Sequence, residues 1–201
     1  MRIEADQGEA EPLSQAVGLY PSFRTLAMSS SAFLTANFSR SGDRVSAQWR
    51  LTLDHRVPDV WAALTAADRL PQWLAPGTIE LRLGGVARLD FEDSGGVIDS
   101  RVTAYEPERL LEYSWSIPGE PLRPLRWMLE PLGSATLLTL RLTVPPKEDA
   151  ARAAAGWAAH LEMLQAALLG APARFPYPVV KEAREAYAQQ VSALRAPVET
   201  V

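Results

Sequence analysis

The sequence contains no cysteine, which excludes disulfide bonds, thiol nucleophiles and zinc sites built on thiolate ligands. It contains two histidines, His55 and His160, which are far apart in the chain. No HExxH motif or other metal-ligand spacing is present, so neither a transition-metal site nor another cofactor is predicted.

Positive charge and long apolar runs are also missing. The chain has 20 lysines and arginines against 24 aspartates and glutamates, a formal net charge of -4. Because phosphate binding needs clustered cations, a nucleic acid partner is not predicted. No stretch is apolar for long enough to span a bilayer. The first residues are acidic where a signal peptide would be basic, so a cytoplasmic protein is expected.

Motifs for nucleotide binding and for hydrolases are absent too. Neither G-x-S-x-G, G-x-x-x-x-G-K-[ST] nor G-x-G-x-x-G occurs. The pair Gly84-Gly85 indicates a turn instead of a phosphate cradle. Asp90 alternates onto the polar face of a predicted strand, so it is expected in solvent and not in a catalytic carboxylate pair.

Two-residue periodicity dominates the middle of the chain and predicts an antiparallel sheet. Residues 45–54 alternate between apolar and polar side chains, as in a strand with one buried face. Similar alternation precedes them, and the turn residues 41–43 predict a hairpin that begins near Ser31. Further strands are predicted over 79–83, 87–91, 97–105, 111–115, 125–129 and 138–142.

Helical periodicity occurs on either side of these strands. Residues 57–74 predict two short helices, because Pro71 prevents a single long one. After Pro145-Pro146, apolar residues spaced alternately by four and three predict a long helix that ends at Gly170. Its apolar stripe comprises Ala150, Ala154, Trp157, Leu161, Leu164 and Leu168. Together these elements predict an α+β fold in which the long helix covers one face of a curved sheet.

The predicted domain spans residues 31–170 and has an extension at each end. Residues 1–30 hold few large apolar side chains and are expected to be mobile, with Met28 as an alternative start. In residues 171–201, Lys181–Leu194 is expected to form a short amphipathic helix that packs on the core or on a partner.

Four segments, in this order, resemble a known family: "VPDVWAALTAADRLPQWL", "LGGVARLDF", "VTAYEPERLLEYSWS" and "AGWAAHLEMLQAALLG". They resemble the activator of heat shock protein 90 ATPase homologue group of the START-like helix-grip superfamily, also called SRPBCC. That superfamily includes polyketide cyclases, aromatases and lipid carriers. The resemblance covers residues 32–170 and implies a sheet wrapped around the C-terminal helix, with a cavity between them.

His160 borders the apolar stripe and is the one candidate for a catalytic residue, as a general base or as a donor to a ligand. The residues favour another interpretation, a partly buried histidine bonded to a neighbouring strand, because no nucleophile or orienting acid is identified beside it. His55 is expected to be a solvent-facing loop residue. Arg101 and Glu130 are candidates for polar contacts inside a cavity.

Gly156 is unusual in a helix interior, where it costs about 1 kcal/mol relative to alanine. The expected reason is the close approach of a strand or of a large ring. Trp157 is expected to meet Tyr113, Trp115 and Trp127 on the sheet. Aromatic residues at these periods can form a core or line a cavity, and both interpretations stay open. The predicted ligand-binding residues are Trp61, Trp73, Tyr113, Trp115, Trp127, Trp157, His160 and Leu164.

Three functions are compatible with these features. The first is binding of a hydrophobic, amphipathic or aromatic small molecule between the long helix and the sheet. The second is a protein-interaction or chaperone-associated module without a catalytic site, in which the exposed sheet face and the tail helix contact a chaperone or a second copy of the chain. The third is a polyketide cyclase-like enzyme that uses His160. The lack of an identifiable nucleophile favours a protein that is not an enzyme.

Overall fold

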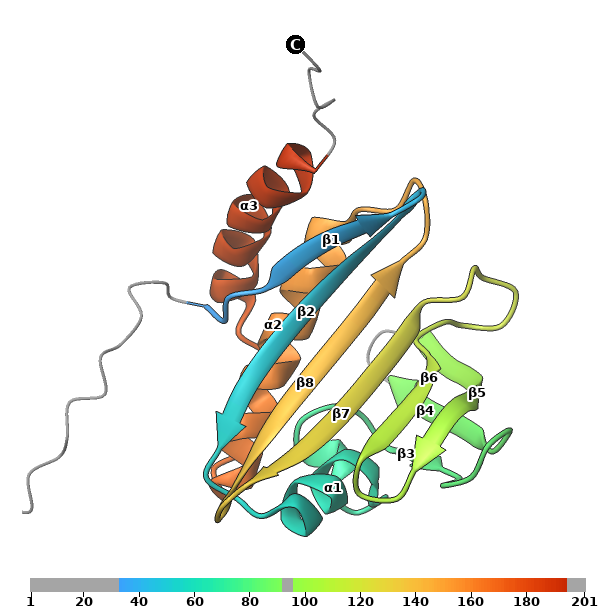
Figure 1. Cartoon of the computed structure of the whole chain (residues 1–201), viewed down its shortest axis with the longest axis vertical. Helices are drawn as coiled ribbons and strands as arrows, with labels where there is room; N and C mark the ends of the chain where they lie inside the picture. The colour runs from blue at the N-terminus through green and yellow to red at the C-terminus, as the bar shows by residue number, and fades with distance from the viewer. Residues whose placement is uncertain (1–32, 92–95, 195–201) are drawn as a thin grey trace, which may run out of the picture.

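The computed structural model describes residues 33–91 and 96–194. Within them, eight strands form one antiparallel sheet in the order β1-β2-β8-β7-β6-β5-β4-β3, with helices behind it (Figure 1). The strands are β1 Asn37–Ser41, β2 Arg44–Leu53, β3 Gly77–Ile79, β4 Val86–Phe91, β5 Gly96–Glu106, β6 Leu110–Ser114, β7 Pro124–Leu132 and β8 Ala135–Val144. The helices are α1 Val57–Thr65, the short 3₁₀ helix η1 Leu70–Gln72, α2 Ala150–Leu168 and α3 Tyr177–Ala193. This arrangement confirms the predicted α+β helix-grip fold.

Glycines in the left-handed region close two of the hairpins. Gly42, with a φ of +59°, turns β1 into β2, and Gly133, with a φ of +63°, turns β7 into β8. Glycine adopts this conformation without the steric cost that a side chain would add. The hairpin predicted at residues 41–43 is confirmed. Its first strand begins at Asn37, whereas the predicted start near Ser31 lies outside the described residues.

Alternating side chains give the sheet one buried face and one exposed face. In β2, Ala47, Trp49 and Leu53 are buried, while Arg50 and Thr52 between them are exposed. The same alternation runs through β4, β6, β7 and β8, as two-residue periodicity requires. The strands predicted over 87–91, 97–105, 111–115, 125–129 and 138–142 are therefore confirmed.

The strand predicted over 79–83 is wrong for most of its length. β3 ends at Ile79, and Leu83 is 70% exposed. The backbone turns back on itself here. Residue 85 comes so close to residue 80 that a Cβ placed on Gly85 would lie 2.3 Å from the carbonyl oxygen of Glu80. Leu81 and Leu83 have the two-residue spacing of a strand, although the chain turns here, and this spacing led to the wrong prediction.

The helices follow the predicted breaks. Pro71 lies in η1, so residues 57–74 form two short helices as expected. α2 begins after Asp149, whose carboxylate accepts a hydrogen bond from the backbone N–H of Arg152 at 2.9 Å and caps the helix. It ends before Gly170, which has a φ of +74°. Apart from the half-buried Leu168, the predicted apolar stripe is buried. In the described part of the chain, no helix has the length and apolarity to cross a membrane.

The helix of the C-terminal segment lies along α2 (Figure 1). α3 begins at Tyr177, one turn before the expected start at Lys181, with a proline in its first turn. Its apolar side, formed by Ala183, Tyr187 and Val191, is buried. The apolar side of this helix is therefore already covered within the same chain.

Tyr187 connects α3 to the start of the sheet through hydrogen bonds and ring contacts. Its side chain is 0% exposed, and its hydroxyl donates a hydrogen bond to the carbonyl oxygen of Leu34. The hydroxyl also accepts one from the indole Nε1 of Trp49 at 3.4 Å. The rings of Phe33 and Phe38 meet the Tyr187 ring edge-on, with centroids at 5.6 and 5.3 Å. One side chain thus joins α3, β2 and the segment before β1.

Replacing Tyr187 with phenylalanine should lower the free energy of unfolding by about 1–2 kcal/mol, because the Leu34 carbonyl loses its donor and Trp49 loses an acceptor. Urea denaturation measures this loss. The matched control is Tyr177→Phe, which removes a hydroxyl from a side chain that is 75% exposed and makes no side-chain hydrogen bond within residues 33–91 and 96–194. Equal losses in the two variants would contradict the role assigned to Tyr187.

Candidate functional site

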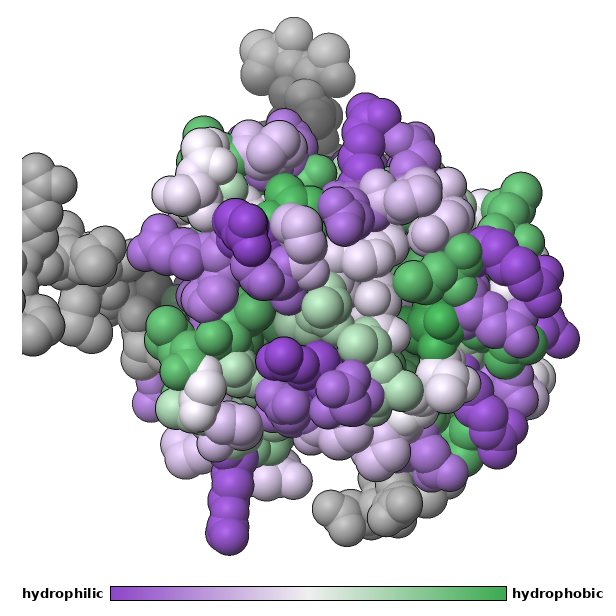
Figure 2. Space-filling model, turned by 90° about the horizontal axis from the view of Figure 1, so that it is seen from below, coloured by the Kyte–Doolittle hydropathy of each residue, from purple (hydrophilic) through white to green (hydrophobic). Residues whose placement is uncertain are grey.

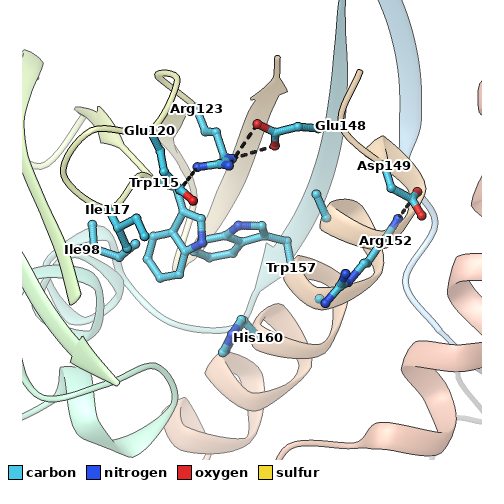
Figure 3. A pocket seen from close by; sticks show the side chains of 12 residues that line it. Ile98, Trp115, Ile117, Glu120, Arg123, Glu148, Asp149, Arg152, Trp157 and His160 are labelled. Carbon is cyan, nitrogen blue, oxygen red and sulfur yellow. Dashed lines mark hydrogen bonds and ion pairs between the residues drawn. The ribbon is translucent and has the colours of Figure 1, made fainter. Parts of the chain in front are cut away.

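An open cavity of about 580 Å³ lies between α2, β5 and the loop that joins β6 to β7. Its volume is in the range of small-molecule binding sites. Figure 3 shows two indole rings at its centre, a cluster of charged side chains above them and an imidazole below. The lining residues are Ile98, Trp115, Ile117, Glu120, Arg123, Glu148, Asp149, Arg152, Ala153, Gly156, Trp157 and His160.

The apolar part of the cavity is built on two tryptophans. The rings of Trp115 and Trp157 meet at 71° with centroids 4.7 Å apart. Trp157 is 3% exposed and packs on Trp127 at 5.6 Å, whereas Trp115 is half-buried. Trp157 therefore belongs mainly to the core, and Trp115 supplies the accessible ring. The predicted contacts of Trp157 with Trp115 and Trp127 are confirmed; its predicted contact with Tyr113 is not among its ring contacts.

One wall of the cavity is an ion-pair network centred on Arg123. The guanidinium donates from Nε and Nη2 to the two carboxylate oxygens of Glu148, at 2.7 and 2.9 Å, and from Nη1 to Glu120 at 2.5 Å (Figure 3). The hydroxyls of Ser114 and Ser116 accept hydrogen bonds from the backbone N–H of Arg123. Because the Glu148 contact is bidentate and the Arg123 side chain is 18% exposed, it fixes the β6–β7 loop against the start of α2.

A second arginine, Arg152, lines the cavity from α2 and has no such partner. The carboxylate that could neutralise it, Asp149, pairs instead with Arg184 of α3 at 2.7 Å. Burial opposes ionisation of Asp149, but the hydrogen bonds from the Arg152 backbone and from Arg184 outweigh it and keep its pKa below the usual value. Among the described residues, the guanidinium of Arg152 makes no ion pair or hydrogen bond.

His160 is enclosed by aromatic rings at the other end of the cavity. Its ring centroid lies 5.5 Å from that of Trp157, 6.4 Å from that of Phe91 and 5.3 Å from that of Phe175, which follows α2. Its Nδ1 lies 3.3 Å from the carbonyl oxygen of Trp73. The expected hydrogen bond to a strand is thus wrong in its partner, since Trp73 directly follows η1.

The Trp73 contact fixes which nitrogen of His160 carries the proton. A carbonyl oxygen accepts hydrogen bonds and never donates them, so Nδ1 is the protonated nitrogen and Nε2 carries the lone pair. Burial lowers the pKa of His160 to about 4, although the hydrogen bond to Trp73 opposes this shift. At neutral pH the ring is uncharged. Nε2 is then a hydrogen-bond acceptor without a partner among the described residues.

Gly156 has no packing reason to be a glycine, which contradicts the expected close approach of a strand or ring. A Cβ built on this residue would meet nothing within 4 Å, leaving out its two neighbours in the chain and the backbone of its own helix. Gly156 instead lines the cavity. The missing side chain leaves open space over α2.

The structure divides the predicted ligand-binding residues between the cavity and the core. Trp115, Trp157 and His160 line the cavity. The others are buried outside its lining: Trp61, Trp73, Tyr113, Trp127 and Leu164. Trp73 illustrates the difference, because it packs edge-on against Trp127 at 5.9 Å and donates its indole N–H to the carbonyl oxygen of Ala63 at 2.9 Å. A ligand-binding role for these five stays a prediction.

Three polar residues lie elsewhere than expected. Arg101 and Glu130 are exposed and outside the cavity lining, so the predicted contacts inside it are wrong. His55 is not solvent-facing: it is half-buried, and its Nε2 bonds the carbonyl oxygen of Leu168 at 3.0 Å. Residues 33–91 and 96–194 contain no group of three or more histidines, aspartates or glutamates placed to hold a metal ion.

The charged residues of the cavity were not predicted from the sequence. The Arg123–Glu148 pair joins a loop to a helix cap, and no local pattern reveals such a contact. The position of Arg152 had a signal, because Arg152, Gly156 and His160 are spaced by four and therefore lie along one side of a helix.

The depressed pKa of His160 should make stability depend on pH. Between its unfolded pKa of about 6.5 and its folded pKa of about 4, the unfolded chain takes up a proton that the folded chain does not. Stability should therefore fall as pH falls through this window, by about 2 kcal/mol between pH 7 and pH 5, and the contribution of this residue levels off once the pH lies below 4.

The measurement is urea denaturation at pH 7 and pH 5, for the protein and for His160→Gln. The difference between the two proteins isolates His160, because their carboxylates are the same. An identical pH dependence in both would contradict the burial of a neutral imidazole.

Comparison with solved structures places this fold among known ones. The crystal structure of CalU16 from Micromonospora echinospora is 26% identical, with 79% of this chain and 98% of CalU16 covered and a TM-score of 0.67. Protein EF2215 from Enterococcus faecalis, a conserved protein of unknown function, is 21% identical over 80% of this chain and 92% of its own, with a TM-score of 0.67. DynU16, a protein in the dynemicin biosynthetic locus, is 29% identical over 67% of this chain and 51% of DynU16, with a TM-score of 0.58.

The search of curated proteins gives no significant match. The family model for "Activator of Hsp90 ATPase homolog 1-like protein" matches residues 54–169. This range runs from the end of β2 to the end of α2 and includes every residue that lines the cavity. It covers more than half of the sequence, so the chain belongs to the activator of Hsp90 ATPase homolog 1-like family, within the START-like helix-grip superfamily.

Proposed function

We propose that the protein binds a hydrophobic or amphipathic small molecule in the cavity beside α2. The observation that carries this proposal is the open space over Gly156, in a cavity of about 580 Å³. A volume of this size accommodates a drug-sized ligand.

The energetics of Gly156 support a use for that space. Alanine is favoured over glycine in a helix interior by about 1 kcal/mol, and no neighbouring atom would obstruct a methyl group at this position. The glycine thus lowers the stability of α2 without improving its packing. A ligand that passes close to the helix would account for it, because a side chain at 156 would project into the ligand's place.

The lining also has the composition of a ligand site. Trp115, Ile98 and Ile117 offer apolar surface, while charged groups stand at one end and an imidazole at the other. Small-molecule sites combine apolar walls with a few polar groups that fix the orientation of the ligand. DynU16, which is 29% identical, belongs to a biosynthetic locus, and this supports a small-molecule role.

The same features favour binding over catalysis. A general base works best when its pKa lies near the working pH, and the pKa of His160, at about 4, makes it a weak base at neutral pH. Its ring bonds the Trp73 carbonyl, and no carboxylate among the described residues orients it. The cyclase-like alternative therefore has no catalytic constellation to support it.

A partner-docking role has less support than ligand binding. The apolar side of α3 is occupied by its packing on α2. On the face shown in Figure 2, hydrophobic side chains form separate groups between hydrophilic ones, not one broad apolar surface. Neither feature resembles the contiguous apolar patch of a stable protein interface.

A neutral fluorescent probe, N-phenyl-1-naphthylamine, should bind the protein with enhanced fluorescence. Gly156→Ala should raise the free energy of unfolding by about 0.5–1 kcal/mol, because alanine favours the helix. Gly156→Leu should weaken probe binding by about tenfold or more, because its side chain fills the space that the ligand needs. Fluorescence titration measures the affinity, and urea denaturation measures the stability.

The control variant is Gln189→Leu, which adds the same side chain on the exposed side of α3, away from the cavity. It should leave probe affinity unchanged. Absence of probe binding at millimolar concentration, or equal affinity in the Gly156→Leu variant and the parent protein, would contradict the proposed function.

A further inference from the structure

Three residues of α2 form a line along the cavity: Arg152, Gly156 and His160. They are spaced by four residues, so each lies about one turn beyond the last on the same side of the helix. The rise from Arg152 to His160 is about 12 Å along the helix axis. A cation, an open space and a neutral acceptor thus follow one another along a single wall.

Arg152 stands out because its charge is not neutralised. The other ionised side chains of the lining form ion pairs: Arg123 with Glu120 and Glu148, and Asp149 with Arg184. Arg152 has no ion-pair partner within the described residues, although its side chain lines the cavity. A guanidinium in this position can bind a carboxylate through two parallel hydrogen bonds.

The ion-pair network of Arg123 restricts where an anion can lie in the cavity. Arg123 carries one positive charge between two carboxylates, so that cluster is net negative. An anionic ligand group is repelled by this cluster and attracted to Arg152 on α2. The charges of the cavity therefore orient a ligand as well as attract it.

His160 favours a hydrogen-bond donor, in contrast to the anion that Arg152 attracts. Its Nδ1–H is bonded to the Trp73 carbonyl, which leaves Nε2 as an acceptor. A hydroxyl or N–H of a ligand satisfies this nitrogen, whereas an ether or a second carboxylate does not. The rings of Trp157, Phe91 and Phe175 around the imidazole restrict its rotation.

The space between the two polar ends suits a flat ring. Gly156 presents bare backbone to the cavity, and the half-buried ring of Trp115 lines it from the loop. In Figure 3 the indoles of Trp115 and Trp157 lie between Arg123 above and His160 below. Aromatic rings pack on indoles edge-on or offset, with centroids 4.5–7 Å apart.

We infer that the ligand is an aromatic acid with a hydrogen-bond donor at its far end: the carboxylate pairs with Arg152, the ring lies over Gly156 beside Trp115, and a hydroxyl or N–H donates to Nε2 of His160. This inference rests on the proposed function and narrows it to one chemical class. It assigns Arg152 and His160 as the residues that determine specificity.

Three probes that share one naphthalene ring separate these contributions. They are 6-hydroxy-2-naphthoic acid, its methyl ester, which lacks the charge, and 6-methoxy-2-naphthoic acid, which lacks the donor. Each is titrated against bound N-phenyl-1-naphthylamine, and its affinity is read from the displacement of the dye. At low ionic strength the affinity of the hydroxy acid should exceed that of either relative by about tenfold or more. The ester loses the charged contact with Arg152, and the methoxy acid loses the hydrogen bond to His160.

The variants are Arg152→Gln, His160→Leu and the control Arg141→Gln. Arg141 is an exposed arginine on the opposite face of the sheet, and its guanidinium has no partner in the part of the chain that the structure describes. Arg152→Gln should abolish the preference for acid over ester and leave ester affinity unchanged. His160→Leu should abolish the preference for hydroxyl over methoxy, and Arg141→Gln should change neither. In the parent protein, added salt should weaken binding of the acid and leave binding of the ester unchanged. This measurement needs no variant.

Equal binding of acid and ester in the parent protein would overturn the inference while leaving the proposed function intact. So would an equal loss of acid affinity in Arg152→Gln and Arg141→Gln, because the attraction would then come from the general field of the protein. If neither the dye nor any of the three probes binds at millimolar concentration, both the inference and the proposed function fail.

Discussion

The contact between α2 and the inner face of the sheet is the interaction on which the rest of the structure depends. Leu161 and Leu164 are fully buried, and Trp157 packs against Trp127 of β7. The hydrophobic effect fixes this side of the helix, because several large apolar side chains leave water together. The line from Arg152 to His160 consequently lies at the border of the buried stripe, over the cavity. The core thus determines where the cavity can be.

Ion pairs at the start of α2 connect the remaining parts to this contact. Arg123 holds the β6–β7 loop to Glu148, and Arg184 holds α3 to Asp149, the helix cap. Phe175, between α2 and α3, packs on His160. The family match ends at residue 169, so residues beyond it help to position both ends of the cavity wall.

Periodicity in the sequence predicted most of the fold, because apolar alternation and helical spacing are local signals of which face is buried. It could not separate core from cavity. Trp73 and Trp115 look alike in sequence, yet Trp73 is 1% exposed and Trp115 lines the cavity. Gly156 was noticed as unusual, but its explanation was wrong: whether space lies above a helix residue depends on the β6–β7 loop, which is distant in the chain.

We propose that the space over Gly156 is the ligand site of this protein. A crystal structure of the protein with bound 6-hydroxy-2-naphthoic acid tests it most directly. We expect electron density for the ring within van der Waals distance of Gly156, with the carboxylate at Arg152 and the hydroxyl at His160. Ligand density at another place, or a cavity filled by side chains of the β6–β7 loop, would contradict it.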